Sequence, residues 1–230
     1  MLMIIFIGFL ILSWSVSSKL KSKFKKYSKV RLNYGLTGRD VAEKMLRDNG
    51  IHDVKIVSVG GQLTDHYNPA NKTVNLSPDV YNGNSVSAAA VAAHECGHAV
   101  QHAVGYRPLE MRSTLVPLQN ISSKVLNFIF IAMLFGGFLL PQFISFDLAM
   151  KVIIACYTVF TAFAFITLPV EINATQRALS WLNTSGIATG QLQEQAKDAL
   201  KWAAYTYVVA ALSALVTLMY YVMMYLGNRD

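Results

Sequence analysis

Residues 85–105 read SVSAAAVAAHECGHAVQHAVG, and this stretch decides how the rest of the chain can be organised. Ser85 is a residue type favoured at helix N-caps, and Gly105 is one favoured just after a helix. The stretch between them is rich in alanine, the best helix former, and it contains no proline. It therefore predicts one helix that starts after Ser85, runs to about Val104 and ends at Gly105.

The pentapeptide His94-Glu95-Cys96-Gly97-His98 in this helix has the pattern H-E-x-x-H. Residues four apart are separated by about 40° around a helix axis and ~6 Å along it, so both imidazoles point to one side and can hold one Zn²⁺. Glu95 is displaced by about 100° from His94, which keeps it beside the metal without displacing the water that it would deprotonate. Chance matches to so short a pattern occur, but the chain has only 5 histidines and this match lies on a predicted helix. The pattern indicates metal-assisted hydrolysis with Glu95 as the general base.

A catalytic zinc site needs a third protein ligand and an open fourth position for water. The strongest candidate is Glu171, in the stretch LPVEINAT at residues 168–175, where an apolar segment ends. A carboxylate that close to a membrane is costly unless it has a partner. One turn later, Ala174 would allow close approach to the His-bearing helix and Thr175 could hydrogen-bond a metal ligand. The alternative is an interfacial anchor whose carboxylate pairs with a cation, Arg177 or Lys124.

Two other side chains of the helix are not expected to bind the metal. His102 lies eight residues after His94, about 12 Å along the axis, which is too far for the two imidazoles to share an ion at ~2 Å ligand distances. We expect His102 either to contact a metal ligand without touching the ion or to lie at the surface. Cys96 points to a different face from the two histidines, so we expect a small packed thiol. The metzincin class is excluded, because it needs histidine and glycine where Val104 and Gln101 stand.

The composition is that of a membrane protein. Of the 230 residues, 53% are hydrophobic and only 14% are charged, and the mean hydropathy is +0.37. A helix needs roughly 20 residues to cross ~30 Å of hydrocarbon. Four stretches lack formal charges for about that length, namely residues 1–18, 125–146, 152–170 and 202–228. Each is expected to be a transmembrane segment, and the second and third are expected to form a tight hairpin through Asp147.

The charges beside the first of these segments predict the orientation of the chain. Seven Lys and Arg residues follow it directly and none precedes its apolar run, which favours an uncleaved anchor over a cleaved signal peptide. Because cationic flanks stay in the cytoplasm, we expect the N-terminus outside and residues 19–124 inside. The two crossings between His94 and Glu171 put both side chains on the same side of a cell membrane.

A short amphipathic helix is predicted ahead of the His-bearing one. Thr37 and Asp40 have the spacing of a capping box, and Gly50 is a suitable terminator. Apolar residues between them recur at helical spacing, so one face of this helix is expected to pack on the core of the water-exposed unit.

Strands are predicted between these two helices. Residues 54–59 are rich in Val and Ile and predict one strand. Residues 62–67 and 73–76 flank an Asn-Pro-Ala-Asn turn, which predicts a small β-hairpin. The strand at residues 62–67 could offer an exposed edge to an extended peptide. Four side chains are candidates for an oxyanion donor, each better explained by a structural role: His66, Tyr67, Tyr205 and Tyr207.

Charge and cysteine content exclude other classes. Ten of the 20 Lys and Arg residues lie between Lys19 and Arg47, so the net charge of +7 is a local cluster without aromatic interleaving, and no nucleic-acid partner is expected. Disulfide bonding is not expected, because Cys96 lies in the predicted cytoplasmic unit and Cys156 in a membrane segment.

The chain resembles the neutral zinc metallopeptidases of the YugP type, which are found in bacterial membranes. The resemblance covers nearly the whole chain and is carried by LTDHYNP at 63–69, VAAHECGHA at 91–99, LPVE at 168–171 and YTYVVAAL at 205–212. It implies a membrane-bound gluzincin similar to HtpX-type proteases, with one Zn²⁺ per chain held by His94, His98 and Glu171 and with Glu95 as general base. HtpX-type enzymes place Asp four residues after the third ligand, where this chain has Thr175.

The predicted fold is mainly α, a multi-pass membrane protein with a zincin-like catalytic unit in which the H-E-x-x-H helix lies beside a small β-hairpin or sheet. The predicted parts are an N-terminal transmembrane anchor (1–18), the water-exposed zincin-like unit (19–124), a transmembrane hairpin (125–170), a third-ligand helix with a connecting segment (171–201) and a C-terminal transmembrane helix (202–228).

The predicted function is hydrolysis of peptide bonds by Glu95-assisted attack of a zinc-bound water at the cytoplasmic membrane face. Expected partners are peptide or protein substrates, membrane proteins among them, and the lipid bilayer. The main alternative is a catalytically silent zinc-binding scaffold or adaptor, against which Glu95 argues because a structural zinc site needs no general base. A site-2 type intramembrane protease would need a Leu-Asp-Gly sequence, which is absent. A channel or transporter is disfavoured because the last three apolar segments contain no charged residue.

Overall fold

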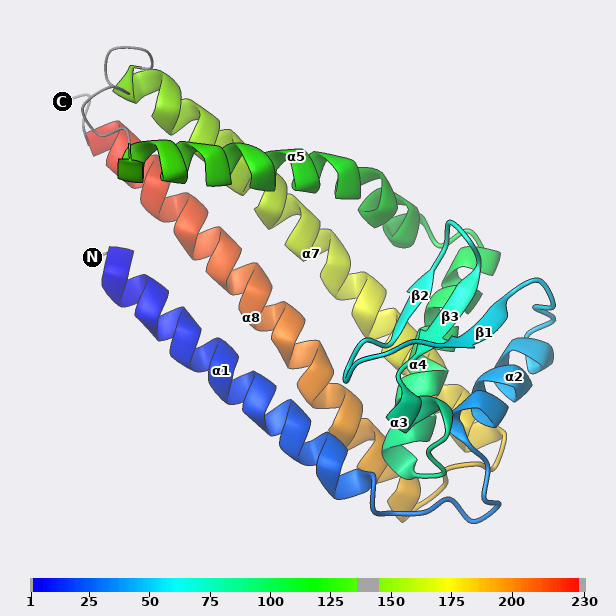
Figure 1. The fold of residues 1–230 in the computed structure, drawn as a ribbon. Coiled ribbons are helices and arrows are strands. Elements are labelled where there is room, and N and C mark those ends of the chain that lie inside the picture. The colour runs from blue at the N-terminus through cyan, green and yellow to red at the C-terminus, as the bar shows by residue number, and fades with distance from the viewer. Residues whose placement is uncertain (1, 136–144, 228–230) are drawn as a thin grey trace. The chain divides into compact units, whose positions relative to one another are not determined.

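The computed structural model describes residues 2–135 and 145–227 of the chain, and the described part is mainly helical, with one small sheet (Figure 1). In chain order the elements are α1 (Leu2–Tyr27), α2 (Gly38–Asp48), β1 (Lys55–Ser58), β2 (His66–Asn68), β3 (Thr73–Leu76), α3 (Pro78–Tyr81), α4 (Val86–Ala103), α5 (Arg107–Phe135), α7 (Phe146–Thr184) and α8 (Gln191–Gly227). The mainly α fold with a small sheet agrees with the prediction.

Four helices in the described part are long and apolar enough to cross a membrane: α1, α5, α7 and α8. All four extend beyond the predicted segments. α5 begins at Arg107, well before the predicted start of the second segment at Val125. The predicted turn through Asp147 is wrong, because Asp147 lies in the first turn of α7, whereas residues 136–144 of the predicted second segment lie outside the described residues.

α7 also corrects a predicted boundary, because this helix runs through Pro169 to Thr184 and no separate third-ligand helix begins at residue 171. A proline inside a helix removes one hydrogen bond and costs about 3 kcal/mol. Packing after Pro169 offsets this cost, since side chains at four-residue spacing are fully buried: Val170, Ala174, Ala178 and Leu182. Glu171 therefore lies on the same continuous helix as the apolar segment before it.

The chain divides into two compact units. The helical unit comprises Met1–Ser13, Glu110–Leu168 and Tyr207–Asp230. Its buried cluster contains Leu126, Met150, Ile153, Cys156 and Tyr221. Stacking of Tyr157 on Tyr221, with ring centroids 5.2 Å apart, and a 2.7 Å hydrogen bond from Tyr225 Oη to Asp147 join α7 to α8 within this unit.

The mixed unit comprises Trp14–Leu109 and Pro169–Thr206 and contains the sheet. The strand order is β1-β3-β2, with β1 parallel to β3 and β2 antiparallel to it. The predicted hairpin is confirmed, but its first strand begins at His66 and not at Gln62. Gly61 and Leu63 have positive φ angles, which an extended strand does not accept.

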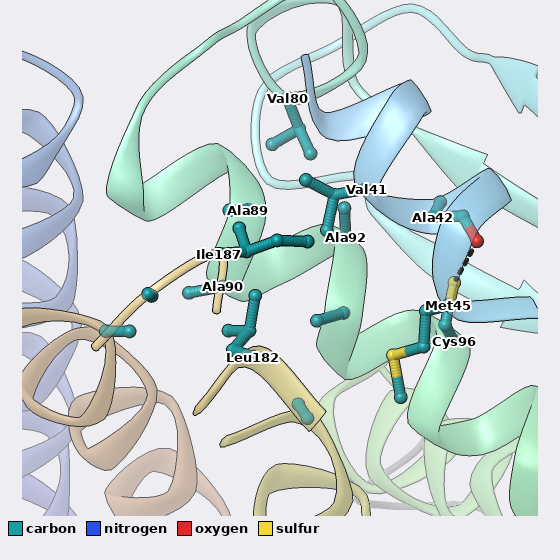
Figure 2. Close-up of a cluster of buried hydrophobic side chains, with 14 of the residues drawn as sticks. Val41, Ala42, Met45, Val80, Ala89, Ala90, Ala92, Cys96, Leu182 and Ile187 are labelled. Atoms are coloured by element: carbon teal, nitrogen blue, oxygen red, sulfur yellow. Dashed lines mark hydrogen bonds between the residues drawn. The ribbon is translucent and has the colours of Figure 1, made fainter. Parts of the chain in front are cut away.

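One face of α2 packs on the core of the mixed unit, as predicted. Thr37 and Asp40 form a complete capping box at its start, and Gly50 follows its end with a φ of 70°. Its apolar face packs on α4, where Val41, Ala42 and Met45 lie against Ala92 and Cys96 (Figure 2).

Cys96 is the packed thiol that the sequence predicts. It is fully buried, and its Sγ lies 3.6 Å from the carbonyl oxygen of Ala42 (Figure 2). Burial raises the pKa of this thiol, so Cys96 stays neutral and unreactive in the folded protein.

Candidate metal centre

The helix that carries the H-E-x-x-H pattern forms as its sequence predicts. Ser85 Oγ accepts a hydrogen bond from the Ala88 N–H at 3.3 Å, and α4 ends at Ala103, before Gly105 with a φ of 63°. Its small residues let a second helix approach closely. An added Cβ at Gly97 would lie only 2.6 Å from the carbonyl oxygen of Ala174 on α7. The close approach predicted for Ala174 is therefore confirmed, with Gly97 as its partner.

His94, His98 and Glu171 meet at this helix contact. Among the described residues they form a group in which one ligand atom from each lies within 4.8 Å of the others. Glu171 Oε2 lies 3.2 Å from His94 Nε2 and 3.6 Å from His98 Nε2. Two ligand atoms of a tetrahedral ion with bonds of about 2.0–2.1 Å are roughly 3.3 Å apart. Two imidazoles and one carboxylate at this spacing fit a Zn²⁺ ion.

Glu171 is almost completely buried, at 2% exposure. Its carboxylate faces the two imidazoles, 77 and 73 residues earlier in the chain. The Arg177 Nε–H donates to Asn173 Oδ1 at 2.8 Å. A buried carboxylate needs partners that compensate for the loss of water, and the two histidines provide them.

Contacts to the far ring nitrogens hold both histidines in place. His94 Nδ1 lies 3.2 Å from Thr175 Oγ1, the contact expected for Thr175. His98 Nδ1 lies 3.0 Å from Gln101 Oε1. In the sequence, Gln101 stands out only as a mismatch to the metzincin pattern, and this contact is not predicted. The available signal was its position one helical turn after His98, on the same side of α4.

Glu95 lies beside the three side chains and is oriented by the sheet. It is buried, and its Oε2 accepts a hydrogen bond of 3.0 Å from the backbone N–H of Tyr67 on β2. Nothing in the sequence signals this contact, because a backbone donor leaves no mark on the residue type.

His102 is not a member of the three-residue group, in agreement with prediction. Its Nδ1 lies 2.7 Å from the hydroxyl of Tyr67. His66 is exposed, with its Nδ1 2.8 Å from the carbonyl oxygen of Thr64.

The charges around His98 oppose the effect of its burial. Burial by itself lowers the pKa of a histidine, but the neighbouring Glu171 and Glu95 carboxylates outweigh it, so the pKa of His98 is raised. A metal ion would have to displace a proton from this imidazole, which makes metal binding weaker at low pH.

Comparison with known proteins agrees with this arrangement. Residues 2–226 match the sequence model of the family described as "Putative neutral zinc metallopeptidase". The chain is also similar to the "Putative membrane protease YugP" of Bacillus subtilis (strain 168), with 40% identity over 219 residues that cover 95% of this chain and 94% of the relative. No solved structure matches the chain. The match over nearly the whole length shows that the chain belongs to the putative neutral zinc metallopeptidase family.

Proposed function

We propose that this protein is a membrane-embedded zinc metallopeptidase of the gluzincin type, with His94, His98 and Glu171 as the metal ligands. The single observation that carries the proposal is the 3.2 and 3.6 Å spacing of Glu171 Oε2 from the two imidazole nitrogens, next to the buried Glu95. Bound Zn²⁺ would supply a Lewis acid that lowers the pKa of a coordinated water toward ~7 and polarises a carbonyl.

Glu95 is the general base in this proposal. Its carboxylate takes a proton from the attacking water and later gives it to the leaving amine of the cleaved peptide bond. The N–H of Tyr67 holds one carboxylate oxygen, Oε2, at 3.0 Å and thereby fixes the direction in which the other oxygen can act. A site with a buried, oriented carboxylate beside the metal ligands supports turnover more than a purely structural zinc site.

The substrate in this proposal is an extended peptide that binds beside β2. This strand is at one edge of the sheet, and the outward N–H of Tyr67 already donates to Glu95. N–H and C=O of one strand residue point to the same edge, so the Tyr67 carbonyl is the group available to accept a bond from a peptide N–H.

Membrane location is indicated by the four long apolar helices and by the membrane protease relative. We place the active site at the cytoplasmic face and the N-terminus outside, because the cluster of lysines that begins at Lys19 follows the first apolar segment. Labelling of a single cysteine introduced at either end of α1 with a membrane-impermeant reagent tests this orientation, and a reactive site near Lys19 in intact cells would contradict it.

The first experiment measures zinc and peptidase activity on detergent-purified protein. We expect one zinc per wild-type chain, loss of zinc in Glu171→Ala, and loss of casein cleavage with zinc retained in Glu95→Gln. Glu43→Gln is the matched control, because Glu43 is an exposed glutamate on α2. Full activity of Glu95→Gln would refute the mechanism. Zinc binding without cleavage of any peptide tested would favour the silent scaffold, and wild-type protein without zinc would refute the metal site.

A further inference from the structure

Gln101 is a buried polar side chain whose hydrogen bonds link the two helices of the metal centre. It is fully buried on α4, one turn after His98. Its Oε1 lies 3.0 Å from His98 Nδ1, and its Nε2 donates to the Val170 carbonyl oxygen at 2.8 Å and to Asn173 Oδ1 at 3.0 Å. Burying an amide is costly unless its groups are paired, and here both ends of the amide have partners.

The Val170 contact fixes the orientation of this amide. A backbone carbonyl oxygen can only accept a hydrogen bond, so the NH₂ group of Gln101 must face Val170. The amide oxygen therefore faces His98. An amide oxygen also only accepts, which requires the proton of the neutral His98 ring to lie on Nδ1. The other nitrogen, Nε2, is then left with its lone pair directed toward Glu171, where a metal ion would bind.

The contact of the other histidine does not have this effect. The hydroxyl of Thr175 can donate or accept, so its 3.2 Å contact with His94 Nδ1 is compatible with either neutral form of that ring. A further contact fixes the Gln101 amide, because Asn173 Oδ1 accepts hydrogen bonds from both Gln101 Nε2 and Arg177 Nε. Of the two histidines, His98 is the one whose proton position is set by its protein partner.

We propose that Gln101 is a positioning residue of the metal centre: its amide oxygen holds His98 in the form that presents Nε2 to the ion. This inference rests on the proposed metal site. Its amide nitrogen also ties α4 to α7 at Val170, the residue before Glu171, so one side chain orients His98 and braces the helix turn that carries the third ligand.

Three variants separate the acceptor role from a merely structural one. Gln101→Met removes both hydrogen-bonding ends, whereas Gln101→Glu keeps an oxygen that can accept from His98 and loses the NH₂ group. Gln193→Met is the matched control, because Gln193 is a partly buried glutamine whose Nε2 also donates to a carbonyl of α7, that of Leu179, at 2.9 Å. Zn²⁺ affinity is measured by competition with a chromophoric chelator, and thermal unfolding of the metal-free proteins checks the fold.

We expect Zn²⁺ to bind Gln101→Met about 10–100-fold more weakly than wild type, Gln101→Glu within about fivefold of wild type, and Gln193→Met like wild type. Unchanged affinity in Gln101→Met would overturn the proposal. Equal weakening in Gln101→Met and Gln101→Glu would overturn the role of the amide oxygen, because loss of the hydrogen bond to Val170, which both variants share, would then account for the weaker binding. Wild-type protein that binds no zinc would instead refute the proposed function itself.

A measurement on the wild type keeps the proposal testable if Gln101→Met does not fold. In zinc-loaded protein labelled with ¹⁵N-histidine, the His98 Nδ1–H should give a hydrogen-bonded NMR signal that exchanges slowly with water. A rapidly exchanging His98 signal in the wild type would overturn the proposal.

Discussion

Gly97 is the position at which one added methyl group tests whether α4 and α7 must lie this close for a metal to bind. A Cβ at Gly97 would lie 2.6 Å from the carbonyl oxygen of Ala174 and 3.2 Å from its Cα, both backbone atoms. Ordinary van der Waals contacts of a Cβ begin at 3.4 Å, so the methyl group of Gly97→Ala is about 0.8 Å too close to this oxygen. A backbone carbonyl within a helix cannot rotate away, and the two helices must therefore separate at this point.

Two opposing effects determine the stability of Gly97→Ala. Alanine in place of glycine inside a helix contributes about 1 kcal/mol of helix propensity, whereas overpacking a buried contact costs about 1–3 kcal/mol. The free energy of unfolding should thus fall by no more than about 2 kcal/mol. The effect on zinc affinity should be larger than this effect on stability. Gly97 precedes His98 and Ala174 follows Glu171 by three residues, so a shift of about 0.8 Å exceeds the tolerance of roughly 0.2 Å for metal–ligand distances.

We expect Zn²⁺ to bind Gly97→Ala at least about tenfold more weakly, while the protein stays folded. The assay is chelator competition for zinc on detergent-purified protein, with thermal unfolding followed in parallel. Gly8→Ala is the control, because Gly8 lies in α1 with no atom near its added Cβ. Wild-type zinc affinity in folded Gly97→Ala would refute the idea that this close helix contact positions Glu171 against the histidines.

Three further predictions concern the mixed unit. Burial raises the pKa of Asp65 against the hydrogen bonds donated by Ser77, so protonation at acid pH favours folding and this contribution is lost as the pH rises through the raised pKa. Asp65→Asn should remove that part of the pH dependence, which lies above the ordinary pKa of an aspartate, and equal slopes of unfolding temperature against pH in both proteins would contradict this. The buried Cys96 thiol should react with an alkylating reagent only after unfolding, as mass spectrometry of labelled peptides can show. Thr37→Ala should lower the free energy of unfolding by about 1 kcal/mol through loss of the α2 capping box, and Thr37→Ser should retain most of it.

Local rules made several elements predictable. The caps of α2 and α4 depend on hydrogen bonds between residues close in the chain. Helix periodicity brings His94 and His98 to one side of α4. The four apolar segments can be recognised from the composition of each stretch. Thr175 was predictable for a similar reason, since it lies one turn after Glu171 on the same helix face.

The positions that could not be predicted depend on contacts between distant segments. Packing of an apolar stripe carries α7 through Pro169, where a local rule favours a break. Because Gly61 and Leu63 have positive φ angles, β2 begins only at His66, later in the chain than predicted. Neither feature has a signal in the residue pattern, because each is selected by the packing of the whole unit.

The residue pattern predicts the helix with its two histidines and base, the apolar segments, and Glu171 as the strongest candidate for the third ligand. The folded chain adds that Glu171 faces both imidazoles, that a backbone N–H of β2 orients Glu95, and that Gln101 links His98 to α7. The physical reason is that helix periodicity acts over one or two turns, whereas these contacts join residues up to 77 positions apart and exist only once α4, α7 and the sheet have packed together.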